Sequence, residues 1–250
     1  MATKALQKSG DAATSVAVQR PSSLVSIQDQ IAAQIASMSD RIAPPSGSKI
    51  KLSPGAFTLP DGSKTPGPLE LVIVDFVAKN SFYEGNFDSN NITSPVCFSI
   101  GTNPAKMVPS ANSPMPQAKT CAECPMNQFG SKGNGKACKN ERVLAVLPPE
   151  AQDDTALWQL AVSPTGLKGF DAYVGGVVRT FQTPPVGVVT MVSLDPTKTY
   201  ASLVFSDAQP NHHLTSHFAR QAEAQAMLAT EPDVTNTKPA KATPARGMRR

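Results

Sequence analysis

The sequence predicts a mainly β, α+β domain, built as a small β-barrel of short strands with flanking helices. Three observations lead to this fold class. Between residues 46 and 208, short apolar runs alternate with turn residues such as the Pro60-Asp61-Gly62 segment. All four cysteines lie within residues 97–142, a polar segment that is inserted between apolar runs. The 23 prolines and the 40% hydrophobic content suit one core with many loops and tails.

Strands are expected wherever the apolar runs are short. Leu69–Ala78 is the strongest of them, and its nearly continuous apolar sequence predicts a strand covered on both faces. The other expected strands cover residues 49–52, 56–59, 95–100, 141–148, 157–162, 186–194 and 200–206. Within the domain, Ser163-Pro164 predicts the start of a helix, which Gly175-Gly176 should weaken or end.

The two ends of the chain are expected to differ from the domain. Residues 1–20 are small and polar, which predicts disorder. Residues 21–43 predict an amphipathic helix, because apolar side chains recur every three or four positions before Pro44-Pro45. Its narrow apolar stripe suits packing on its own domain or self-association. A second helix is expected in residues 211–230, followed by a basic, disordered tail at 231–250.

The spacing of the cysteines predicts a structural zinc site. Cys121 and Cys124 form a C-x-x-C pair, which places two sulfurs on one tight turn. Cys97 and Cys138 would complete a tetrahedral set of four thiolates. Three alternatives stay open: two disulfides, a redox pair, and an iron–sulfur cluster. The sequence lacks an apolar signal segment, which favours a reducing cytoplasmic setting and therefore a metal.

Basic and aromatic residues surround this module, and the two types together are typical of proteins that bind single-stranded nucleic acid. The 130–139 segment, GSKGNGKACK, is glycine-rich, so its backbone amides could also approach phosphates. Three aromatic residues at 82–87 lie in a polar context and either close over the core or stack on bases. The candidate nucleic-acid-binding residues are Phe82, Tyr83, Phe87, Lys119, Phe129, Lys132, Lys136, Lys139 and Arg142.

The segment CAECPMNQFGSKGNGKACKNERVLAVL resembles a group of tailed-bacteriophage proteins that carry C-x-x-C-P-x-N-x-F/W-G-S followed by A-C-K. The resemblance extends from about residue 47 to 207. It implies an OB-like barrel with an inserted zinc module, since phage single-stranded DNA-binding proteins combine these features. The chain departs from such proteins at its C-terminus, which is basic where theirs is usually acidic.

Two functions are therefore expected from the sequence. The first is a non-enzymatic, sequence-independent single-stranded DNA-binding protein of a phage replication or recombination system. The second is a phage structural or assembly protein that self-associates, as a homo-oligomer, through the 24–42 helix. An enzyme is not expected, because no catalytic motif is present and His213 and His217 lack a third metal ligand nearby. The sequence predicts neither a membrane partner nor a small-molecule substrate.

Overall fold

The computed structural model describes residues 48–85 and 92–236, together with Ile27 and Gln30. The chain divides into two compact units, Met1–Pro44 and Pro45–Arg250. Ile27 and Gln30 are helical. The rest of the helix predicted for 21–43, the N-terminal segment 1–20, Phe87 and residues 237–250 lie outside the described residues. Their predictions therefore stay untested.

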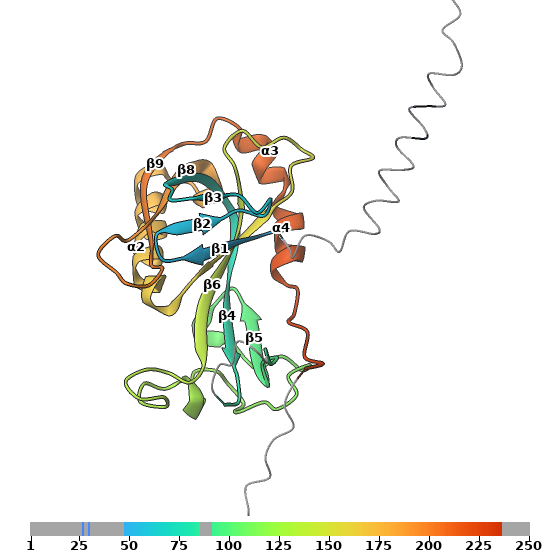
Figure 1. Cartoon of the computed structure of the whole chain (residues 1–250), viewed down its shortest axis with the longest axis vertical. Helices are drawn as coiled ribbons and strands as arrows, with labels where there is room; N and C mark the ends of the chain where they lie inside the picture. Colours follow the sequence, from blue (N-terminus) through green and yellow to red (C-terminus); the bar gives the residue numbers. More distant parts are fainter. Residues whose placement is uncertain (1–26, 28–29, 31–47, 86–91, 237–250) are drawn as a thin grey trace, which may run out of the picture. The chain divides into compact units, whose positions relative to one another are not determined.

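The second unit is mainly β, as expected, with a curled mixed sheet and a few helices (Figure 1). The strand order is β3-β2-β1-β7-β6-β4-β8-β9, and β5 pairs with β4 outside this path. Only the β1–β7 pair is parallel within the described part of the chain. The strands are β1 (Lys49–Ser53), β2 (Ala56–Thr58), β3 (Lys64–Thr65), β4 (Leu69–Phe82), β5 (Cys97–Gly101), β6 (Lys139–Leu147), β7 (Trp158–Val162), β8 (Val188–Leu194) and β9 (Leu203–Pro210).

Strand β4 connects the body of the domain to the cysteine module, which we define as residues 97–142. Residues 69–71 of β4 pair with β8, and residues 72–81 pair with β6. Its last residues, 78–82, also pair with β5. The register with β6 shifts between Ile73 and Asp75, and such a bulge increases the local twist of a sheet. Figure 1 shows β4 and β6 running out of the body together to the module.

The main core lies between the curled sheet and helix α2 (Leu167–Phe181). Phe170 is fully buried there and makes edge-to-face contacts with Phe76 and Phe205, each with ring centroids 5.1 Å apart. Gly175-Gly176 was expected to weaken or end this helix. The two glycines do not end it, because the helix continues to Phe181. Burial of Val177 just beyond the two glycines stabilises the helix against their cost of about 1 kcal/mol each.

The opposite face of the sheet is covered by α4 (Gln221–Leu228), which packs Ala224 and Leu228 against Ala145 and Leu147. The helix expected within residues 211–230 is divided, with α3 (Leu214–Ala219) ending before Arg220. The Arg220 guanidinium donates to the Thr155 carbonyl at 3.0 Å and forms an ion pair with Glu223. These contacts hold Arg220, the residue between α3 and α4, in place.

His217 in α3 has a structural role. It is 1% exposed, and its two ring nitrogens face the Asn211 amide at 3.1 Å and the Ala151 carbonyl at 3.4 Å. A carbonyl only accepts, so Nε2 carries the proton and Nδ1 accepts from Asn211. Burial lowers the pKa of His217, which favours this neutral form. Hydrogen bonding thus accounts for this histidine without a metal.

The first residues after α4, which fall within the tail predicted for 231–250, contact the module. The Glu231 carboxylate accepts hydrogen bonds from the Ser110 hydroxyl and from the Asn112 amide. The Ser94 amide donates to the Asn236 carbonyl at 3.2 Å. Residues 231–236 therefore contact the folded unit, and residues 237–250 lie outside the described residues. None of the helices in the described residues is long and apolar enough to cross a membrane.

Candidate metal centre and nucleic-acid interface

The fold brings the four cysteines to one end of the sheet. Cys97 begins β5 and pairs with Phe82, while Cys138 precedes Lys139, which pairs with Ser81. Because β5 and β6 flank the same end of β4, they deliver Cys97 and Cys138 to one place. All four cysteines are buried, and none forms a disulfide.

The C-x-x-C turn is closed by its own hydrogen bonds. The Asn127 side-chain amide donates to the Cys121 carbonyl at 2.7 Å, and its backbone amide donates to the Cys124 carbonyl at 3.0 Å. The Cys138 amide donates to the Met126 carbonyl at 2.8 Å, which joins the turn to the start of β6. Hydrogen bonds to their backbone groups thus hold both turn cysteines and Cys138 in place.

A cavity of about 10 Å³ lies between the four cysteines and is also lined by Asn80 and Phe82. This volume is about the smallest that can hold one water-sized species. Burial raises the pKa of Cys138 to about 12, and the neighbouring cysteines add to the effect. Burial likewise raises the pKa of Cys97. Four thiolates would therefore repel one another here unless a cation balanced their charge.

The chemistry of the donor set fits zinc. Four cysteine sulfurs are the usual ligands of structural zinc, at about 2.3 Å from the metal. In the described residues, no three His, Cys, Asp or Glu side chains are grouped closely enough to hold an ion. Zinc binding stays a proposal, which rests on the donor set and on the four cysteines that line one cavity. A zinc with four such ligands would stabilise the module and leave no open position for catalysis.

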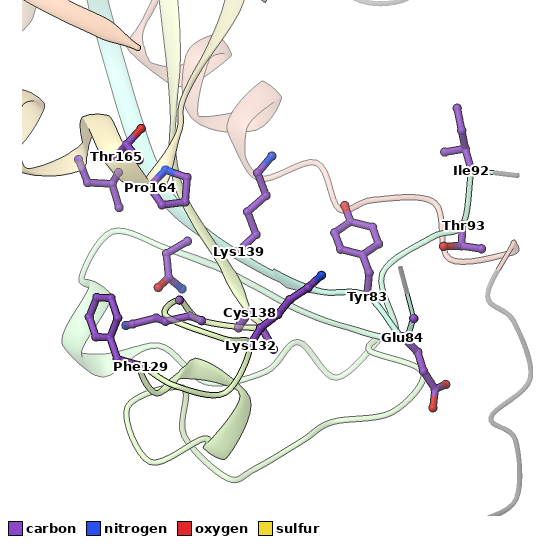
Figure 2. Close-up of a pocket in the computed structure, with 16 residues that line it drawn as sticks. Tyr83, Glu84, Ile92, Thr93, Phe129, Lys132, Cys138, Lys139, Pro164 and Thr165 are labelled. Atoms are coloured by element: carbon purple, nitrogen blue, oxygen red, sulfur yellow. The ribbon is translucent and has the colours of Figure 1, made fainter. Parts of the chain in front are cut away.

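Beside the cysteines lies a larger groove of about 820 Å³ (Figure 2). In that view, Phe129 borders the groove on one side and Tyr83 and Ile92 on the other, with Lys132 and Lys139 between them. Pro164, Thr165 and Leu167, at the start of α2, line it as well. The complete lining comprises Tyr83, Glu84, Gly85, Ile92, Thr93, Phe129, Lys132, Gly135, Lys136, Ala137, Cys138, Lys139, Asn140, Pro164, Thr165 and Leu167.

Phe129 is the most unusual residue of this groove, because 80% of its surface is exposed. The Lys136 ammonium lies 5.1 Å from the centre of its ring, a cation–π distance. Tyr83 is 42% exposed and Ile92 is 73% exposed. An exposed ring beside lysines offers a stacking surface and a positive charge to the same ligand.

The glycine-rich loop presents side chains to the groove, and several of its amides are already engaged. The Gly130 and Lys132 amides both donate to the Gly135 carbonyl, and the Gly135 amide donates back to Lys132. Gly130 and Gly133 adopt positive φ angles of 89° and 56°, which lets the loop close on itself. The expectation that this loop's amides approach phosphates is therefore weakened at these positions.

The structure brings five of the nine candidate nucleic-acid residues together in the groove: Tyr83, Phe129, Lys132, Lys136 and Lys139. Phe82 lines the cysteine cavity instead. Arg142 points to α2, where it forms an ion pair with Asp171 at 3.1 Å. Lys119 is exposed but does not line the groove.

Sequence reasoning missed the contributions of Ile92 and of the start of α2. Ile92 is exposed, and in the sequence it is a lone apolar residue between Asn91 and Thr93. That pattern is a signal that the sequence does carry. Thr165 had no such signal, because only the pairing of β6 with β7 brings the residues after β7 to the module.

Comparisons with known proteins do not assign the chain to a family. It matches no family model, no curated protein and no solved structure. The function is therefore argued from the site.

Proposed function

We propose that this protein is a non-enzymatic, sequence-independent single-stranded DNA-binding protein of a phage replication or recombination system. The observation that carries this proposal is the groove beside the cysteine cavity. It places two exposed rings, Tyr83 and Phe129, on either side of Lys132 and Lys139, with Lys136 over the Phe129 ring. Rings stack on bases of any type and lysines meet phosphates, so the combination suits an unpaired strand without sequence preference.

The groove favours a single strand over a duplex for a physical reason. In a duplex the faces of the bases are already stacked on one another, so Tyr83 and Phe129 could reach them only by unstacking base pairs. The lysines would attract both forms, since phosphate attraction does not depend on pairing. The rings should therefore provide the preference for a single strand, and the lysines most of its salt dependence.

The motif and the fold support the remaining parts of the proposal. The C-x-x-C-P-x-N-x-F-G-S motif supports the phage setting, and the convergence of four buried thiols supports a structural zinc. The curled sheet, with a groove at one end and an inserted module, is compatible with an OB-like half-barrel. We include this OB-like assignment in the proposal.

The direct test is fluorescence anisotropy with labelled single-stranded DNA, duplex DNA and RNA of the same length at two salt concentrations. We expect tighter binding to single-stranded DNA than to duplex, with affinity that falls as salt rises. Equal, weak binding to all three at low salt would reject the proposal. The alternative, an assembly protein acting through the 24–42 helix, would then lead, and light scattering would test its self-association.

We also expect the basic tail to add salt-dependent affinity without adding structure. Truncation after Asn236 removes five basic residues and no acidic residue. Each lost phosphate contact should lower the slope of log affinity against log salt by about 0.7. The melting temperature should not change, because the Glu231 and Ser94 contacts are retained. An unchanged slope would show that the tail does not contact the strand.

A further inference from the structure

A row of lysines leads out of the groove across the sheet face that α4 partly covers. Side chains of directly paired residues share a face, and those two positions apart along a strand do too. The pairs Ser81–Lys139 and Lys79–Glu141 therefore place Lys79 and Lys139 on the same face, on neighbouring strands. Figure 2 shows Lys139 extending out of the groove in the direction of α4.

Lys49 in β1 belongs to this face as well. It pairs with Gln159 of β7, Gln159 pairs with Ala145 of β6, and Ala145 pairs with Asp75 of β4. Asp75 and Lys79 are four positions apart on β4 and so point to the same side. The three lysines thus share one face that begins at the groove, where Lys139 is a lining residue.

The charges on this face are only partly balanced. Glu141 pairs with Lys139 at 2.6 Å, and the Asp75 carboxylate accepts from Gln225 at 3.0 Å and from its neighbouring backbone amide. Among the described residues, neither Lys79 nor Lys49 forms an ion pair. Lys79 is also half-buried, and the pKa of its ammonium is lowered by burial first and by Lys49 second, whereas Glu141, its partner on β6, raises it.

Burial and the charges of Lys49 and Lys139 therefore disfavour the charged form of Lys79, and Glu141 offsets this effect only in part. An anion placed between Lys49, Lys79 and Lys139 would relieve this repulsion. The lysines lie on different strands, so several regularly spaced phosphates would neutralise them better than one isolated anion. The row also starts at a groove with exposed rings, which suits a nucleic-acid strand.

We propose that a bound DNA strand continues from the groove past Lys139 and across the sheet face to Lys79 and Lys49. This inference rests on the proposed function and extends it, because it makes the binding site longer than the groove. A short oligonucleotide would occupy only the groove, whereas a longer one would also meet the two outer lysines.

The test compares oligonucleotides of two lengths, about 6 and about 16 nucleotides, within the range of site sizes of single-stranded DNA-binding folds. The variant is Lys49→Gln with Lys79→Gln, which removes both charges and keeps much of each side chain. The control is Lys64→Gln with Lys198→Gln, two exposed lysines on β3 and on the β8–β9 turn. Thermal unfolding checks that both proteins fold.

We expect the Lys49/Lys79 variant to bind the short oligonucleotide like the wild type. For the long one, the slope of log affinity against log salt should fall by about 1.4, or about 25-fold in relative affinity over a tenfold salt range. The Lys64/Lys198 control should change neither the affinity for the short oligonucleotide nor the salt slope for the long one. An unchanged slope with the long oligonucleotide would overturn the proposed path across the sheet. A loss of affinity in Phe129→Ala would in that case still support binding in the groove. Equal weakening of both lengths would also overturn it, by placing the lysines within the groove site. If wild-type protein binds neither length, the proposed function fails and the path fails with it.

Discussion

Replacing Cys121 by serine is expected to unfold the cysteine module while the body of the domain stays folded. Structural zinc sites contribute about 10–16 kcal/mol to small zinc-finger peptides at neutral pH, so losing one of four ligands should cost several kcal/mol. The local apolar core of the module is small, with Ala78 and Met107 beside Cys121, and cannot replace this energy. The body has its own core around Phe170, which does not depend on the module. Hydrogen exchange should show lost protection across about residues 97–140 and retained protection in α2 and β8.

The wild-type protein provides the control for this prediction. Metal analysis should find one zinc per chain, and a chelator should produce the same loss of module protection as the substitution. All the cysteines lie in the module, so thiol titration should detect four newly reactive thiols after chelation. Far less than one zinc per chain, with no iron, would contradict the metal proposal. The serine variant would then report only the packing of a buried thiol.

The strands were predictable because their signals are local. Leu69–Ala78 forms most of β4, and the short apolar runs at the two ends of the module form β5 and β6. What the sequence could not show is that β4 continues to Phe82 through polar residues. Asn80 is buried there because the Asn140 amide donates to its side-chain oxygen at 2.7 Å across the strand pair. This stabilisation depends on a residue 60 positions away and leaves no local pattern.

The candidate site was predictable to a similar degree, and for similar reasons. The cysteine spacing predicted that the four cysteines lie together, and five of the rings and lysines predicted near them line the groove. Their individual directions depend on tertiary contacts, as Arg142 illustrates. In sequence it is one more cation of the module, but β6 orients it toward α2, where Asp171 neutralises it. Phe82 and Tyr83 are neighbours in sequence, yet they line different cavities, the cysteine cavity and the groove.

Phe129→Ala is expected to weaken binding of single-stranded DNA by about 5- to 150-fold at every salt concentration. A base stacked on an aromatic ring contributes about 1–3 kcal/mol, and stacking releases no counterions. Phe129 is 80% exposed, so its removal should leave the stability of the protein unchanged. Lys136→Ala should behave differently, with a loss concentrated at low salt and a slope reduced by about 0.7. Anisotropy titrations over a salt series separate the two effects.

A matched control for this substitution lies on α3, where Phe218 is 51% exposed and does not line the groove. Phe218→Ala removes an exposed ring of the same kind and should leave DNA binding unchanged. Phe129→Trp should retain binding, because a larger ring still stacks on a base. If Phe129→Ala and Phe218→Ala both bind like the wild type, the groove's ring is not a stacking surface. The lysines alone would then act as a general phosphate-binding surface, which would not distinguish a single strand from a duplex.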